Sequence, residues 1–188
     1  MEQHEDPSQE NHLVGYIGIV ELGGDLFRGG LLLTDLRGKP QDFRCTSAIK
    51  PNSIQRVLYG GTMIEHMALE LCGLPLLKVL PKTPAVLLAD CPELLLLRPH
   101  VEIPSLWIRR QSAIQSASKS SAIAGGELIA SEDGLFDTVL ASCHADYGDD
   151  LAEAMGLIRQ VGRVLDPLEP FARIAAALKL VQDKAGAR

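Results

Sequence analysis

The feature that most constrains the fold is a series of three short apolar segments near the start of the chain, separated by two turn signals. The segments are residues 13–22, 26–34 and 41–49, and the turn signals are Gly23-Gly24-Asp25 and Arg37-Gly38-Lys39-Pro40. The first segment is apolar on both faces, which is typical of a central strand. The third alternates between apolar and polar residues. The pattern predicts three antiparallel strands.

A helix is predicted after the third strand, because Pro51 is followed by Asn52 and Ser53, two residue types that are common N-caps. Gly60-Gly61 within the helix predicts a kink or a close packing contact. Gly73 then ends the helix. The apolar residues have helical spacing and predict one stripe: Ile54, Val57, Leu58, Ile64, Ala68, Leu71 and Cys72.

The rest of the chain completes an α+β pattern. Residues 85–90 and 94–98 predict two more strands, and a strand at 135–143 precedes two C-terminal helices. We expect an antiparallel sheet (strand-strand-strand-helix-strand-strand) with a C-terminal strand-helix-helix unit. The expected organisation is a disordered tail at 1–11, an α+β core at 12–110, a flexible linker or loop at 111–126, and C-terminal elements at 127–188 packed on the core.

Charge and apolar runs restrict the partners. The net charge is −6, and Arg109 and Arg110 are the only adjacent arginines, so a nucleic-acid partner is predicted to be unlikely. The first residues are polar and acidic, unlike a signal peptide. The apolar runs are too short to span a bilayer. We therefore predict a cytoplasmic protein with no membrane contact.

The cysteines argue against a metal or a cofactor. Cys45, Cys72, Cys91 and Cys143 are widely spaced and form no C-x-x-C pair. A zinc site would need Cys45, Cys91, Cys143 and His144 to converge, whereas structural zinc sites usually show paired short spacings. We predict free thiols, no structural zinc and no cofactor.

Cys143 and His144 could suggest a nucleophile and its base. Adjacent residues of a strand point to opposite faces, so the two cannot form a dyad with each other. A base from elsewhere, such as His66 or His100, would be needed. The sequence leaves open whether Cys143 is reactive, because a reactive thiol requires an activating environment.

An acidic cluster precedes the first C-terminal helix. Asp146, Asp149 and Asp150 could hold a divalent cation through their carboxylates. A simpler interpretation is a capping box formed by Asp150 and Glu153, with Asp149 favoured electrostatically at the helix N-terminus. Capping is the preferred prediction, and metal binding by this cluster stays open.

The order of elements resembles the beginning of the ribonuclease H-like nuclease fold, in which three antiparallel strands precede a helix and another strand. The resemblance implies carboxylates on the first strand, the fourth strand and a late helix, which together hold two metal ions. Glu21, Asp90 and either Asp149 or Asp150 stand at the corresponding places. The same alternation of strands and helices also resembles small profilin-like or PAS-like sensor and scaffold domains.

The two resemblances lead to two functional hypotheses. The preferred one is a non-catalytic interaction or accessory subunit that binds a protein partner or a second copy of itself, because strands that are apolar on both faces need a cover. The alternative is a metal-dependent nuclease that uses Glu21, Asp90 and Asp149 or Asp150.

Overall fold

The computed structural model describes residues 12–112 and 123–186. The predicted tail at 1–11 and most of the predicted linker at 111–126 lie outside these ranges. Residues 123–126, the end of the predicted linker, belong to a strand. In the described ranges, no helix is long and apolar enough to cross a membrane.

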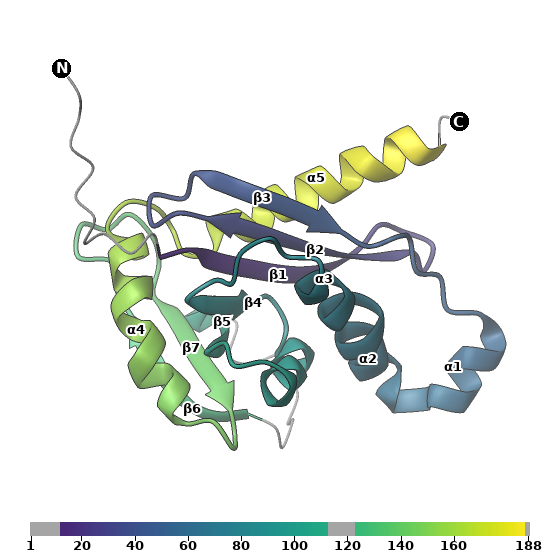
Figure 1. Ribbon diagram of the computed structural model, residues 1–188, viewed down its shortest axis with the longest axis horizontal. Helices are drawn as coiled ribbons and strands as arrows, with labels where there is room; N and C mark the ends of the chain where they lie inside the picture. The colour runs from purple at the N-terminus through teal and green to yellow at the C-terminus, as the bar shows by residue number, and fades with distance from the viewer. Residues whose placement is uncertain (1–11, 113–122, 187–188) are drawn as a thin grey trace.

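Within the described residues, seven strands form one mixed sheet in the order β3-β2-β1-β4-β5-β7-β6 (Figure 1). The strands are β1 (Val14–Glu21), β2 (Phe27–Thr34), β3 (Pro40–Cys45), β4 (Val86–Ala89), β5 (Ser105–Arg110), β6 (Ile123–Ile129) and β7 (Val139–His144). The first three are antiparallel neighbours, which confirms the three-strand prediction. β4 is parallel to β1 and to β5, so the α+β class holds but the purely antiparallel sheet is wrong.

The parallel pairing follows from the connection between β3 and β4. This segment is helical and returns the chain to the same end of the sheet, as a parallel neighbour requires. Its elements are α1 (Ser53–Tyr59), η1 (Gly60–Thr62), α2 (Met63–His66), η2 (Met67–Gly73) and α3 (Leu74–Lys78). All four residues of β4 are buried and apolar, as is typical of a strand covered on both faces.

The predicted strand at residues 94–98 is also wrong. These residues lie in η3 (Pro92–His100), a 3-10 helix whose Pro92 stands at the first helical position, where proline is favoured. The run of leucines carries no periodicity that separates a strand from a buried helical segment. Leu94, Leu95 and Leu97 are all buried, so burial alone accounts for the composition of this run.

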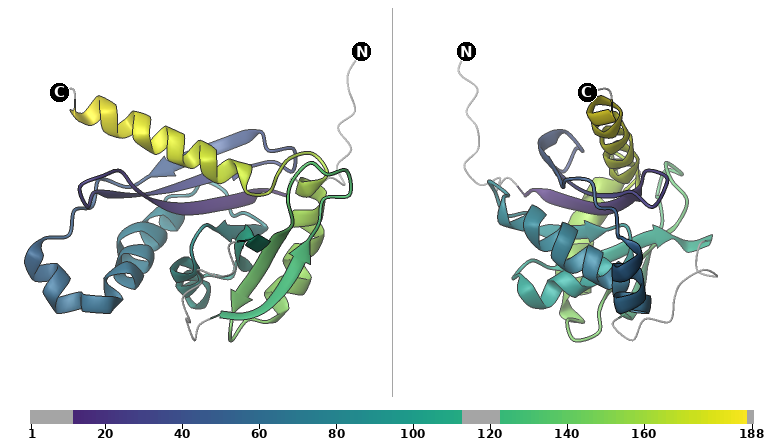
Figure 2. Two further views of the ribbon diagram at one scale, coloured as in Figure 1. Left: turned by 180° about the vertical axis from the view of Figure 1, so that it is seen from behind. Right: turned by 90° about the vertical axis from the view of Figure 1, so that its right-hand side faces the viewer.

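Helices cover both faces of the sheet (Figures 1 and 2). α4 (Asp149–Gly162) and α5 (Glu169–Gly186) pack on one face, and η2, α3 and η3 pack on the other. The approach of α5 to β2 is close, since a Cβ added to Gly30 would lie 2.6 Å from Ile174. β5 pairs with β7, so strands of both predicted units share one sheet. The division at 12–110 and 127–188 stays a prediction.

The start of the predicted helical stripe is not buried. Asn52 caps α1 in a reciprocal capping box with Gln55, which confirms the predicted helix start. However, α1 has no buried residue, and Val57 is 81% exposed. Gly60, at φ 51°, ends α1, and the apolar stripe reaches the core only from Met63 onward. The predicted kink at Gly60-Gly61 is therefore confirmed, and it separates an exposed α1 from a buried η2.

Candidate active site

The middle of β1 and the carboxyl end of β4 bring Gly18 and Asp90 together. In the parallel register Ile17 lies beside Ala89, so the next residues of the two strands are level. The Ile19 N–H donates a hydrogen bond of 3.1 Å to Asp90 Oδ2. A Cβ on Gly18 would lie 2.3 Å from the same oxygen. The absent side chain of Gly18 thus provides the space that the Asp90 carboxylate occupies.

Asp90 is electrostatically unusual. Its Oδ1 is shielded from solvent and has no hydrogen-bond partner. Burial raises the pKa of Asp90 from 3.8 to about 7, and the hydrogen bonds that its carboxylate accepts only partly oppose this. The nearby Glu93 carboxylate raises the pKa of Asp90 further. A carboxyl group with a near-neutral pKa at the end of a parallel strand is a candidate functional group.

The neighbouring thiols are not activated. Burial raises the pKa of Cys72 to about 11 and raises the pKa of Cys91 well above its usual value. Burial also raises the pKa of Cys143, whose thiol lies 3.3 Å from the Ala124 carbonyl oxygen and donates to it. A raised pKa keeps a thiol protonated, whereas a nucleophile must be a thiolate.

The structure places Asp150 in a structural role. Arg98 donates two hydrogen bonds to its carboxylate, at 2.7 and 3.0 Å, and the Ser105 N–H donates a third at 2.9 Å. The predicted capping box is wrong, because the N-cap of α4 is Gly148 and Asp150 lies inside the helix. Asp149 is exposed in the first turn of α4, where a negative charge favours the helix dipole.

The sequence-predicted carboxylates do not converge. Ser105, which binds Asp150, lies beside Leu87 in β4, three residues before Asp90. Glu21 is exposed and lies three residues beyond Gly18 along β1. At ~3.3 Å per residue, three residues correspond to about 10 Å along a strand. Asp150 and Glu21 are therefore each displaced from Asp90 by about this distance, in opposite directions along the strands. Asp146 is exposed and lies near His144 instead, with Asp146 Oδ2 3.9 Å from His144 Nδ1.

The other proposed ligand set also stays apart. Cys45 lies on the edge strand β3, and Cys143 lies on β7, five strands away in the sheet order. At about 4.8 Å per strand, this is roughly 24 Å. Among the residues that the structure describes, no group of three or more His, Cys, Asp or Glu side chains could hold a metal ion.

Two residues on β5 were missed by the sequence argument as site residues. The Arg109 guanidinium lies 3.7 Å above the Trp107 ring. The Trp107 Nε1–H donates a hydrogen bond of 3.3 Å to the Asp90 carbonyl oxygen, which ties this pair to the same end of the sheet. Their i, i+2 spacing on a strand was a signal that both side chains share one face.

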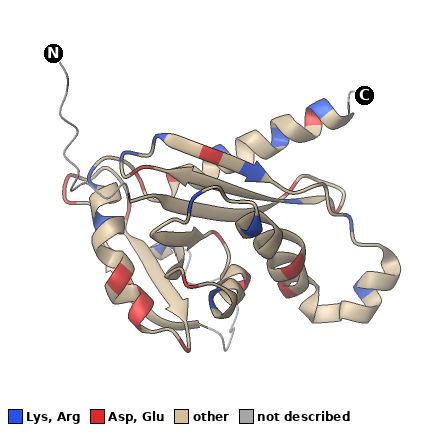
Figure 3. Ribbon diagram, viewed as in Figure 1, with Lys and Arg blue, Asp and Glu red and all other residues tan. Residues whose placement is uncertain are grey.

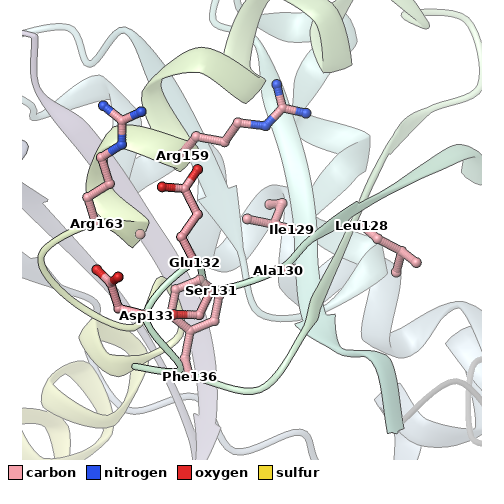
Figure 4. A pocket seen from close by; sticks show the side chains of 10 residues that line it. Leu128, Ile129, Ala130, Ser131, Glu132, Asp133, Phe136, Arg159 and Arg163 are labelled. Carbon is pink, nitrogen blue, oxygen red and sulfur yellow. The ribbon is translucent and has the colours of Figure 1, made fainter.

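A hollow beside α4 is a weaker candidate. Figure 4 shows Arg159 and Arg163 above Glu132 and Asp133 in a pocket of about 120 Å³. Arg159 is already paired with Glu127. Charges of both signs line this pocket, so it offers no clear preference for an anion or a cation.

Comparisons with known proteins identify the fold. No family model matches the sequence, and no curated protein matches it. Human endonuclease V has a similar structure, with a TM-score of 0.56 and 14% identity, covering 97% of this chain and 89% of that one. Two other structures have lower TM-scores of 0.43. Ciona intestinalis endonuclease V, in complex with a DNA that contains inosine, is 10% identical, and the match covers 81% of this chain and 79% of that one. Marinitoga piezophila Argonaute, in complex with a guide RNA, is 12% identical, and the match covers 86% of this chain and 27% of that one.

The chain therefore has an α+β fold similar to that of human endonuclease V. This corrects the preferred functional prediction. A non-catalytic accessory or interaction subunit is wrong as the favoured class, and so is the statement that nucleic acid is an unlikely partner, because the likeness favours the nuclease alternative. The net charge of −6 does not exclude such a partner, because charge over a whole chain says little about a local binding surface.

The residues at the strand ends do not fit the pair of metal ions that the nuclease resemblance implies. Two ions about 4 Å apart need several shared carboxylates. At this position β1 supplies Gly18, which has no side chain, and Asp90 fills the space where a β1 carboxylate would extend. One Asp90 oxygen is engaged by a backbone N–H, and its pKa of about 7 leaves the carboxyl partly in the protonated, non-ligating form near neutral pH.

Proposed function

We propose that this chain binds nucleic acid at the carboxyl ends of β1, β4 and β5. The observation that supports the proposal is the likeness of its fold to an endonuclease over 97% of the chain. In open sheets with parallel strands, ligands bind outside the carboxyl ends of those strands. The proposal also retains the cytoplasmic location predicted from the sequence.

The distribution of charge is compatible with this function. Figure 3 shows Lys and Arg, with some Asp and Glu, on β3 and along α5, whereas α4 carries mainly Asp and Glu. Two of the cations on α5 are exposed and lie outside the ion pairs of the described residues: Lys179 and Lys184. Exposed cations of this kind attract a phosphate backbone without adding sequence specificity.

Direct binding assays test the proposal. We expect labelled single-stranded and duplex DNA and RNA to bind at low ionic strength, with an affinity that falls as salt rises. Lys179→Glu should weaken binding, whereas Glu153→Gln on the acidic side should not. The absence of binding to all four nucleic acids at low ionic strength would contradict the proposal.

Cleavage is measured on the same substrates with magnesium and with manganese. The proposed function is recognition, because no group of acidic, His or Cys side chains in the described residues could hold the metal ions of a hydrolytic site. Cleavage that disappears in Asp90→Asn at unchanged binding would show that one carboxylate supports hydrolysis here. Cleavage unchanged in that variant would place the reacting groups elsewhere.

A further inference from the structure

Arg109 is the least satisfied of the buried or partly buried arginines in the described part of the chain. A guanidinium has five N–H donors. The hydrogen bond recorded for Arg109 is a long one, 3.4 Å from Nη1 to Ser142 Oγ. Its Nε is shielded from solvent and has no partner. Arg109 makes no ion pair with any described residue.

The other arginines of similar burial are paired. Arg98 binds the Asp150 carboxylate, Arg110 binds Asp166, and Arg173 binds Glu169. Arg28 lacks an acid but donates to the Thr46 carbonyl at 2.8 Å and to Gln182 at 3.2 Å. Arg109 differs because no carboxylate or carbonyl oxygen of the described residues accepts a hydrogen bond from it.

The stacking on Trp107 determines where the donors point. The ring covers one face of the guanidinium at 3.7 Å, and the N–H groups lie in the guanidinium plane. The stack therefore leaves the donors available at the edge. Trp107 is itself 6% exposed and is fixed by its hydrogen bond to Asp90, so the support is rigid.

A partly buried Arg109 guanidinium without an ion partner is energetically unfavourable unless an anion binds to it. Burial lowers the pKa of Arg109, because a desolvated charge without a counter-ion is unfavourable. The described residues supply no counter-ion. Stacked, rigid arginines with free donors suit planar, bidentate contacts with phosphate oxygens.

We propose that Arg109, held on the Trp107 ring at the carboxyl end of β5, is an oxyanion-binding residue that receives a phosphate group. The inference rests on the proposed function, which it deepens by assigning a phosphate contact. The phosphate belongs to a polynucleotide backbone or to a free phosphate, and the experiment separates these sources. Ser142 Oγ, beside Arg109 Nη1, supplies a second polar group at this position.

The first arm uses inorganic phosphate as the probe. Phosphate should raise the melting temperature of the wild type more than chloride does at equal ionic strength, since only a ligand of the folded state stabilises it. Arg109→Gln should abolish the difference. Arg37→Gln, which removes the same charge from an exposed loop, should leave it intact. Equal shifts in wild type and Arg109→Gln would overturn the inference.

The second arm uses a labelled single-stranded oligonucleotide. Arg109→Gln should weaken binding about tenfold and reduce the salt slope by about one counter-ion. Arg109→Lys should restore the slope but only part of the affinity, because an ammonium lacks the bidentate fork. A purely structural Arg109 would lower the melting temperature of Arg109→Gln without changing the salt slope, and that result would overturn the inference.

The two arms also separate this inference from the function on which it rests. A phosphate effect that depends on Arg109, without oligonucleotide binding, would support the inference for free phosphate and contradict the proposed function. Oligonucleotide binding that is equal in Arg109→Gln and the wild type would support the proposed function and overturn the inference.

Discussion

The two ends of the parallel strands carry the same kinds of charged residue in opposite states of pairing. At the amino end of β5, Asp150 accepts three hydrogen bonds from Arg98 and Ser105. At the carboxyl ends, Asp90 Oδ1 has no hydrogen-bond partner, and Arg109 has no ion partner in the described chain. The first end satisfies its charges internally, whereas the second leaves donors and an acceptor unused.

The alternation of strand side chains explains why the second end cannot pair internally. Ala89 lies beside Trp107 in the register of β4 and β5. The Asp90 side chain therefore lies on the same face of the sheet as Leu88. The Arg109 side chain lies on the opposite face, together with Trp107. Opposite faces keep the two charges apart. The Arg98–Asp150 ion pair stabilises the fold, whereas the unpaired groups of Asp90 and Arg109 indicate where a ligand would bind.

The largest expected effect is a pH dependence due to Asp90. Its pKa is raised from 3.8 to about 7 in the folded state, so the unfolded chain loses this proton first. The free energy of unfolding should fall by about 4 kcal/mol as the pH rises through this interval, and level off above it. Asp90→Asn, which resembles the protonated form, should remove the fall and exceed the wild type in stability at about pH 8.

Urea unfolding of both proteins at about pH 5 and about pH 8 measures the difference. If the difference in the free energy of unfolding between wild type and Asp90→Asn is the same at both pH values, Asp90 does not destabilise the carboxyl end of β4. The contrast between the two ends of the sheet would then be wrong.

The next largest effect concerns the completed pair. Asp150→Asn should lower the free energy of unfolding by about 3 kcal/mol, because Arg98 would keep its charge while losing a bidentate carboxylate. Asp149→Asn, one residue away and exposed, should change it by less than about 0.5 kcal/mol. Denaturant titration of both variants gives the comparison, and similar values for the two would show that Asp150 is not a structural acid.

A smaller effect is expected at Gly18. An added methyl group would displace the Asp90 carboxylate from the Ile19 N–H, at a cost of about 2 kcal/mol. The cost of Gly18→Ala should largely disappear in an Asp90→Ala background, as a double-mutant cycle can measure. Gly156→Ala in α4, where a Cβ would meet open space, should instead stabilise by up to about 1 kcal/mol. An undiminished cost in the double variant would mean that Gly18 has another role.

The smallest effect is expected away from both strand ends, on α1. Val57→Gln should change the free energy of unfolding by less than about 0.5 kcal/mol, because Val57 is 81% exposed. Leu97→Ala, a fully buried position in η3, should cost about 3 kcal/mol. Thermal unfolding of the two variants gives reference values for an exposed and a buried position, against which the charged substitutions are compared. A large loss of stability in Val57→Gln would show that α1 is covered in solution.

The sequence was informative where the contacts are local. The three-strand pattern, the helix start at Asn52 or Ser53 and the kink at Gly60-Gly61 all depend on residues a few positions apart, and the sequence predicted the strands, the helix start and a kink or close contact at the glycines. The partner of Asp150 is 52 residues away, so a nearby helix start was the only explanation visible in the sequence. Asp90 was placed correctly at a strand end. Its relation to Gly18 depends on a parallel register that residue patterns do not encode.

The position of α5 has a consequence for how the chain is made. α5 covers β1 and β2, which leave the ribosome roughly 150 residues earlier. β5 likewise gains its partner β7 only after the intervening segment is synthesised. The hairpin of β1 and β2 therefore keeps one apolar face exposed until α5 has been synthesised. Long-range closures of this kind slow folding and expose the nascent chain to association. A chaperone that shields the early strands during translation would shorten this vulnerable period.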